Sequence, residues 1–146
     1  MVDNYNNNIA VTGEQHLHYS LHQLAQACIN FAKLERRLDH LDVALHKRGS
    51  VIFRNKLYGW PSYEVNEIPF LVIHQSQPVC KLPTRTQRRA LATGAAKPWC
   101  LVSELQPEPG WVKLSLSQGD EEWLYWASKA LVAAQRTNRR NLNRAA

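Results

Sequence analysis

Arginine and lysine residues cluster in this sequence at spacings that favour the binding of phosphate groups. Residues 81–97 contain five of them and no acid: Lys81, Arg85, Arg88, Arg89 and Lys97. The three arginines have the spacing i, i+3 and i+4, which places them on one face of a helix. A phosphate backbone would offset their mutual repulsion, and the forked guanidinium suits phosphate oxygens. The alternatives are a solvated helix face, or ion pairing within the fold with Glu64, Glu67 or Glu104.

A second basic group lies at the C-terminal end, where residues 135–146 contain no acid. Lys129, Arg136 and Arg140 fall on one side of a helical wheel, with Arg139 and Arg144 nearby. Such a segment can follow a nucleic-acid backbone without sequence specificity. The alternative is a tail that only aids solubility.

A third group combines cations with aromatic rings. Arg54 and Lys56 are followed by Tyr58, Trp60 and Tyr63 in one turn-rich segment. Bases of single strands stack on exposed rings while cations hold the backbone. The alternative is that these rings fill the end of a small core.

Histidine and cysteine residues do not assemble a reactive or metal-binding motif. His18 and His22 have the i, i+4 spacing of two metal ligands, but residues 19–21 lack the glutamate of an H-E-x-x-H motif. Cys28 falls on an apolar stripe, so we expect it in the core. Because no nucleophile elbow, P-loop or dinucleotide fingerprint is present, we expect no catalytic residue, metal or cofactor, and a protein that is not an enzyme.

The composition of the whole chain agrees with a polyanionic partner. The 146 residues contain 18 Lys+Arg against 12 Asp+Glu, a formal net charge of +6. No apolar run reaches the ~18 residues of a membrane-spanning helix, and residues 1–12 lack the pattern of a secretory signal. Three widely spaced cysteines do not form a disulfide framework. We therefore expect a cytoplasmic protein without a membrane partner.

One long helix dominates the N-terminal part of the chain. Residues 14–48 contain no Pro or Gly, and apolar residues recur at steps of three or four, followed by Gly49 as a helix end. A helix of roughly 50 Å is long for such a chain, so it is either broken or packed on a second helix. The residues expected to dock on a protein partner or a second copy are Leu24, Phe31, Leu38 and Leu45.

The remaining elements alternate between short strands and shorter helices. Residues 50–80 read as an antiparallel hairpin or meander, with strands at Val51–Phe53, Tyr63–Val65 and Phe70–His74. A short basic helix is expected over 84–93, strands over 99–105 and 111–116, and a final helix over 120–141 with Trp123, Ala127, Ala130 and Ala134 buried. The predicted fold class is α+β: a flexible leader (1–13), one domain (14–140) and a frayed basic tail (141–146).

The order of these segments resembles that of a known family. A long Leu-rich helix, then Val51-Ile-Phe, then a basic stretch leading into Ala96-Lys-Pro-Trp-Cys-Leu-Val, is similar to the N-terminal part of the replication terminator protein family Tus. That resemblance implies an α+β, monomeric DNA binder of bacterial chromosomes and plasmids. The chain is too short for the two-part clamp of that family, so no residue roles are carried over.

Two functions remain open on these grounds. The first is a non-enzymatic nucleic-acid-binding protein of a bacterium or mobile element, with DNA favoured. Its expected contacts are Arg54, Lys56, Trp60, Arg85, Arg88, Arg89, Lys97, Arg136, Arg139 and Arg140. The second is a protein–protein adaptor, or a small subunit of a larger assembly that could itself be nucleoprotein, docking through the leucine stripe of the long helix.

Overall fold

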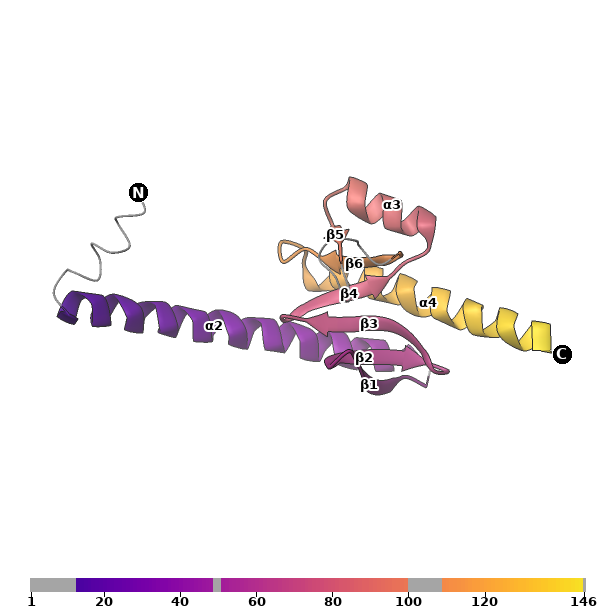
Figure 1. Cartoon of the computed structure of the whole chain (residues 1–146), viewed down its shortest axis with the longest axis horizontal. Helices are drawn as coiled ribbons and strands as arrows, with labels where there is room; N and C mark the ends of the chain where they lie inside the picture. Colours follow the sequence, from indigo (N-terminus) through magenta and orange to yellow (C-terminus); the bar gives the residue numbers. More distant parts are fainter. Residues whose placement is uncertain (1–12, 49–50, 100–108, 146) are drawn as a thin grey trace. The chain divides into compact units, whose positions relative to one another are not determined.

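A computed structural model describes residues 13–48, 51–99 and 109–145, with side chains defined in 21–48, 51–99 and 109–137. The chain divides into two compact units, Met1–Arg36 and Arg37–Ala146, where the sequence suggested one domain over 14–140. The predicted α+β class is confirmed, because three helices accompany a six-stranded antiparallel sheet in the described residues (Figure 1).

Helix α2 (Gly13–His46) matches the expected long helix to within two residues at each end. Its apolar stripe changes character along its length. Leu41 and Leu45 are buried, whereas Leu21, Leu24 and Phe31 are about three-fifths exposed. Leu45 therefore belongs to the core of its own chain, which corrects its assignment to a partner interface. Cys28, expected in the core, is also exposed.

The first four strands of the sheet form a meander, and the sixth strand lies between the fourth and the fifth. Its strands are β1 (Phe53–Leu57), β2 (Trp60–Val65), β3 (Ile68–His74), β4 (Gln77–Lys81), β5 (Ala96–Pro98) and β6 (Trp111–Leu114). The strand order is β1-β2-β3-β4-β6-β5, and all neighbours are antiparallel. The predicted first strand at Val51–Phe53 is wrong, because β1 begins where it was expected to end. The strand expected over 99–105 falls largely on residues 100–108, which lie outside the described residues.

Three two-residue turns join the first four strands. Their central pairs are Tyr58-Gly59, Asn66-Glu67 and Gln75-Ser76, and every one of these residues has a positive φ. Two consecutive residues in the left-handed backbone region give the turn a twist that matches that of the two strands in a tight hairpin. Only one of the six is glycine, so the sheet holds five other residues in a disfavoured backbone region.

Helices α3 (Thr84–Ala92) and α4 (Asp120–Ala145) complete the fold. Helix α3 has Pro83 at its N-cap position instead of the expected Thr84, and it ends just before Gly94, whose φ is +75°. Helix α4 begins at the expected residue but is helical to Ala145, beyond the predicted end at 141. Its predicted inner face is confirmed, since Trp123, Ala127, Ala130 and Ala134 are buried.

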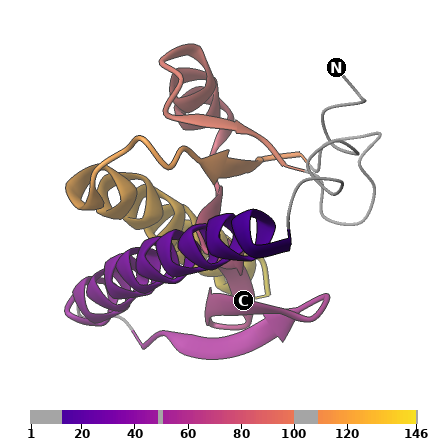
Figure 2. The ribbon, with the colours of Figure 1, turned by 90° about the vertical axis from the view of Figure 1, so that its left-hand side faces the viewer.

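The strand register defines what each face of the sheet carries. Leu71, Cys80 and Val112 stand opposite one another, and all three are fully buried. Val72, Val79 and Lys113 form the neighbouring row on the other face, because successive side chains alternate. Helix α4 contacts β2, β3 and β4 and passes behind the sheet in Figure 1; turned by 90°, it lies to one side of the strands (Figure 2).

The end of α2, from Arg37 onward, belongs to the second unit and is held within it by charged groups. Arg37 bonds Asp120 through Nε at 2.6 Å and donates to the carbonyls of Leu116 and Gln118. Its guanidinium also lies 3.6 Å from the centroid of the Trp123 ring. Asp42, one turn further along, pairs with Arg54 of β1. Two ion pairs, Arg37–Asp120 and Asp42–Arg54, therefore join α2 to other elements, while a third joins His46 to Asp42 within the helix.

Candidate nucleic-acid interface

Helix α3 presents the three arginines that the sequence placed on one face. Arg85, Arg88 and Arg89 are exposed, while Ala90 on the opposite side of the helix is fully buried. Thr84 and Arg85 lie in the first turn, which contains no acidic residue. The sheet edge positions this helix, since α3 contacts β5 and β6. Burial of its apolar side therefore turns the arginine face outward.

Arg89 links α3 to α4. Its Nη2 donates to the hydroxyl of Tyr125 at 2.9 Å, and its guanidinium lies 5.7 Å from the ring centroid of Trp126. Lys129, one turn along α4, has its Nζ 5.3 Å from the same Tyr125 ring. Tyr125 is thus shared by a cation from each helix, and the two basic segments of the sequence meet there.

A surface cavity brings a second pair of cations together. It has a volume of about 290 Å³ and lies between the start of β3, the β4–α3 connection and α4. Lys81 and Arg136 both line it, and its floor is apolar, formed by side chains such as Phe70, Leu82 and Ala130. Lys81 comes from residues 81–97 and Arg136 from the C-terminal segment, so the two segments share this site as well.

These six cations define what we call the α3–α4 basic surface: Lys81, Arg85, Arg88, Arg89, Lys129 and Arg136. Among the described side chains, ion pairs join Arg37 to Asp120, His46 to Asp42 and Arg54 to Asp42. No member of the basic surface takes part in these pairs. Glu64 and Glu67, proposed as alternative partners of the arginines, do not pair with them, and Glu104 lies outside the described residues.

The surface has an acidic boundary at the start of α4. Asp120, Glu121 and Glu122 occupy the first turn, where the exposed backbone N–H groups favour negative charge. Tyr125 follows one turn later, and Lys129 and Arg136 continue along the same side of the helix. Arg139 and Arg140 lie on the last turns of α4, but their side chains are outside the described residues.

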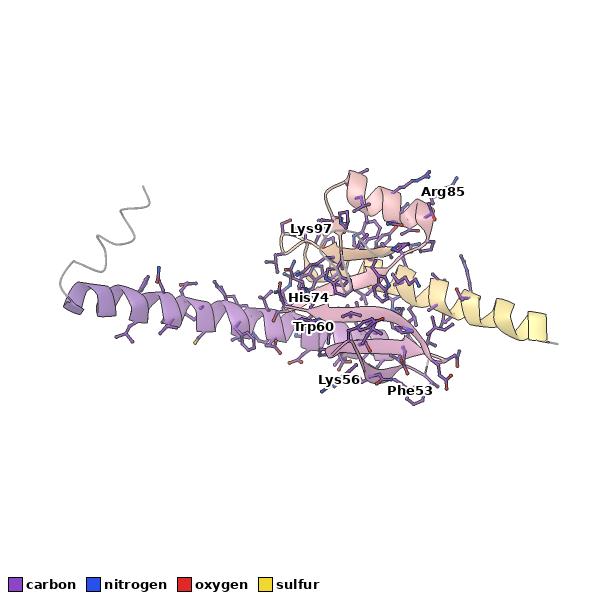
Figure 3. All side chains as sticks on the ribbon, viewed as in Figure 1. Phe53, Lys56, Trp60, His74, Arg85 and Lys97 are labelled. Atoms are coloured by element: carbon purple, nitrogen blue, oxygen red, sulfur yellow. The ribbon has the colours of Figure 1, made fainter. Side chains whose placement is uncertain are left out.

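Arg54, Lys56 and Trp60 lie elsewhere. They belong to β1 and β2, at the opposite edge of the sheet from β5 and α3, and Figure 3 shows Lys56 and Arg85 on opposite sides of the sheet. Arg54 is held by Asp42 and lies 5.8 Å from the Tyr63 ring centroid, which gives it a structural role. Burial raises the pKa of the Tyr63 hydroxyl.

Lys97 is exposed on β5. It belongs neither to the α3–α4 basic surface nor to the group of Arg54, Lys56 and Trp60. Its partner across the strands is Lys113, a residue that the sequence did not single out because it lies in an apolar run. Tyr125 was missed for a different reason: its contact with Arg89 joins residues 36 positions apart, so no local pattern signals it.

The described residues contain no group of three or more His, Cys, Asp or Glu side chains that could hold a metal. None of the helices, as far as the structure describes them, is long and apolar enough to cross a membrane. Comparison with protein-family models, with curated proteins and with solved structures gave no match. The resemblance to the Tus family therefore stays a prediction.

Proposed function

We propose that the chain is a nucleic-acid-binding protein that contacts phosphates through the α3–α4 basic surface. The observation that carries the proposal is the meeting of two basic segments, through Tyr125 and through the cavity of Lys81 and Arg136, without an acidic partner among the described side chains. Six cations without an acidic partner among the described side chains gain no stability from ion pairs with them. A phosphate backbone would compensate them and release counterions.

The resemblance to the Tus family is what favours DNA, and with it a bacterial or mobile-element source. The surface itself fits the phosphates of either nucleic acid, because lysine and arginine contacts to the backbone carry no base information. Arg89 is held by Tyr125 and is partly pre-ordered, whereas Arg85 and Arg88 are exposed and make no hydrogen bond or ion pair with the described side chains.

The test is fluorescence anisotropy with labelled duplex DNA over a range of salt. Each phosphate contact contributes roughly 0.9 to the slope of log affinity against log salt. The double variant R85Q/R88Q should therefore lower the slope by about 1.8 while the fold is unchanged, because both side chains are exposed. The matched control K56Q removes an exposed cation at the other edge of the sheet. Equal slopes for the wild type and R85Q/R88Q would refute the proposal.

A second function, self-association, is favoured by a separate observation on α2. Between Glu14 and Lys33 there is no Asp, Glu, Lys or Arg, in a chain that is 21% charged. Leu21, Leu24 and Phe31 are nevertheless 64%, 61% and 58% exposed. A helix of this kind is marginally stable alone in water, so its apolar side requires a cover.

We infer that the cover is α2 of a second copy. Leu17, Leu21, Leu24, Cys28 and Phe31 follow steps of four and three, the spacing of a coiled-coil seam. Alanines flank this seam at positions 25, 27 and 32, where charged residues usually select a different partner. Two identical helices meet there without like-charge repulsion.

The energy available sets the strength of this dimer. Burying the exposed part of three large side chains in each copy contributes about 1–2 kcal/mol per side chain, or about 6–12 kcal/mol per dimer. This gain is similar to the ~4–15 kcal/mol cost of association. We therefore expect a weak, concentration-dependent dimer, which sedimentation equilibrium would detect; a monomer at every concentration would refute it.

A further inference from the structure

Two lysines face each other on the sheet, away from the α3–α4 basic surface. Lys97 of β5 and Lys113 of β6 are direct partners in the antiparallel register, so their side chains leave the same face. Directly opposed residues have Cβ atoms about 5 Å apart, and like charges at that spacing destabilise a sheet. The pair therefore has an energetic cost that some compensating group should offset.

The described side chains that accept hydrogen bonds from the Lys113 ammonium carry no negative charge. Lys113 is only 7% exposed. Its Nζ lies 3.0 Å from His74 Nδ1 and 3.3 Å from Gln75 Oε1. Burial, and then the charge of Lys97, lower the pKa of Lys113. Burial, and then the charge of Lys113, lower the pKa of His74. An ammonium group that donates to a neutral imidazole and an amide remains uncompensated.

A cavity of about 320 Å³ opens beside the two lysines. Lys97 and Lys113 line it together with the polar side chains of Gln77 and Ser115 and with Gly94, and the described lining contains no carboxylate. An anion seated there would compensate both ammonium groups at once. Phosphate oxygens suit such a site because they accept several hydrogen bonds.

Aromatic rings continue the site from His74. The ring centroid of His74 lies 4.4 Å from that of Trp60 and 5.4 Å from that of Trp99, and Trp99 lies 6.1 Å from Trp111. Trp99 and Trp111 are buried with Val72 and Val79, whereas Trp60 is half-buried at the margin of this cluster. The imidazole of His74 thus separates the Lys113 ammonium from a partly accessible indole.

We propose that this face of the sheet binds one nucleotide unit of a single-stranded nucleic acid, with its phosphate between Lys97 and Lys113 and its base against Trp60. Figure 3 shows Lys97, His74 and Trp60 following one another across the sheet. The strand must be single because bases stacked inside a duplex cannot reach an indole on a protein surface. This inference rests on the proposed function and assigns a substrate form to it.

Lysine footprinting on the wild-type protein tests the inference without substitutions. An amine-reactive reagent is applied with and without a saturating poly-thymidine oligonucleotide, and the modification of each lysine is read by mass spectrometry. We expect the oligonucleotide to protect Lys97, with Lys56 as the internal control whose modification is unchanged. If Lys81 and Lys129 are protected but Lys97 is not, the sheet site is refuted while the proposed function stands. If no lysine is protected, the sheet site is refuted, and if duplex DNA does not bind either, the proposed function fails as well.

Two exposed or half-buried positions supply the matching variants. W60L should weaken binding of the oligonucleotide by roughly 5- to 100-fold, the range for loss of one stacked base. K97Q should lower the salt slope by about 0.7, the single-strand value for one phosphate, and K56Q should leave it unchanged. Protection of Lys97 by inorganic phosphate but not by the oligonucleotide would show a simple anion site and overturn the assignment of a nucleotide, as would wild-type affinity in W60L.

Discussion

Replacing Leu24 by Ala measures directly what covers the apolar side of α2. Leu24 is 61% exposed in the single chain, and full burial of a leucine contributes about 1.5–3 kcal/mol. Burial of that exposed part in a dimer then contributes about 1–2 kcal/mol per copy, or about 2–4 kcal/mol for both. L24A should therefore raise the dimer Kd by roughly 30- to 900-fold.

Ile29 provides the matched control for this measurement. It is 50% exposed on the same helix, but it lies about 140° around the helix from Leu24 and outside the seam. At a concentration near the wild-type Kd, sedimentation equilibrium should show partly dimeric wild type and I29A but monomeric L24A. Equal dissociation constants for L24A and I29A would refute a seam on the Leu24 side.

Four further substitutions probe the second unit. The pKa of His74 is lowered in the fold, so the unfolded chain binds more protons than the folded chain. The free energy of unfolding should therefore fall as pH drops through the range below about 6.5. In urea titrations, H74Q should flatten this fall. Ser76 has a φ of +60°, so S76G should stabilise the protein by about 0.5 kcal/mol. Gly59 has a φ of +84° with open space where a Cβ would lie, so G59A should destabilise the protein by about 1 kcal/mol in the same assay. The opposite order of stability would contradict the turn geometry. R37A should lower the free energy of unfolding by about 2 kcal/mol, because it removes stacking on Trp123 and leaves Asp120 and the Leu116 carbonyl without this donor. An unchanged thermal midpoint would show that the Arg37 contacts contribute nothing to stability.

Periodicity and helix-end signals predicted the helices well. Residues 14–48 show an unbroken apolar repeat, and α2 spans Gly13–His46. Gly94 correctly marked the end of α3, because a residue at φ +75° ends a helix most readily when it has no side chain. These signals are local, so a single sequence is sufficient to detect them.

The separate strand β4 was not predicted, because the turn before it contains neither Gly nor Asn. Gln75 and Ser76 both adopt positive φ, a conformation that Asn and Gly favour, and Pro78 then discourages a strand assignment. Tertiary packing outweighs these local preferences, since Val79 and Cys80 are fully buried between β3 and β6. Strand β5 (Ala96–Pro98) was not predicted either, and the strand expected over 99–105 falls largely outside the described residues.

The division of the α2 stripe could not be read from the pattern either. Leu24 and Leu45 occupy equivalent positions in the repeat, yet one is 61% exposed and the other is fully buried. What separates them is the extent of the second unit, which begins at Arg37. A helical repeat reports which side of a helix is apolar, but it does not report which molecule covers each turn.

The arginines show the same limit in the candidate site. Arg54 and Arg85 both lie in basic segments, and the sequence predicted contacts with nucleic acid for both. In the structure, Arg54 pairs with Asp42 of the preceding helix. Arg85 is instead exposed on α3, whose first turn contains no acid. An ion pair between distant residues leaves no trace in local spacing. The arginines that a fold leaves unpaired are therefore the better guide to an anionic partner, because each paired arginine already has a stabilising role that explains its presence.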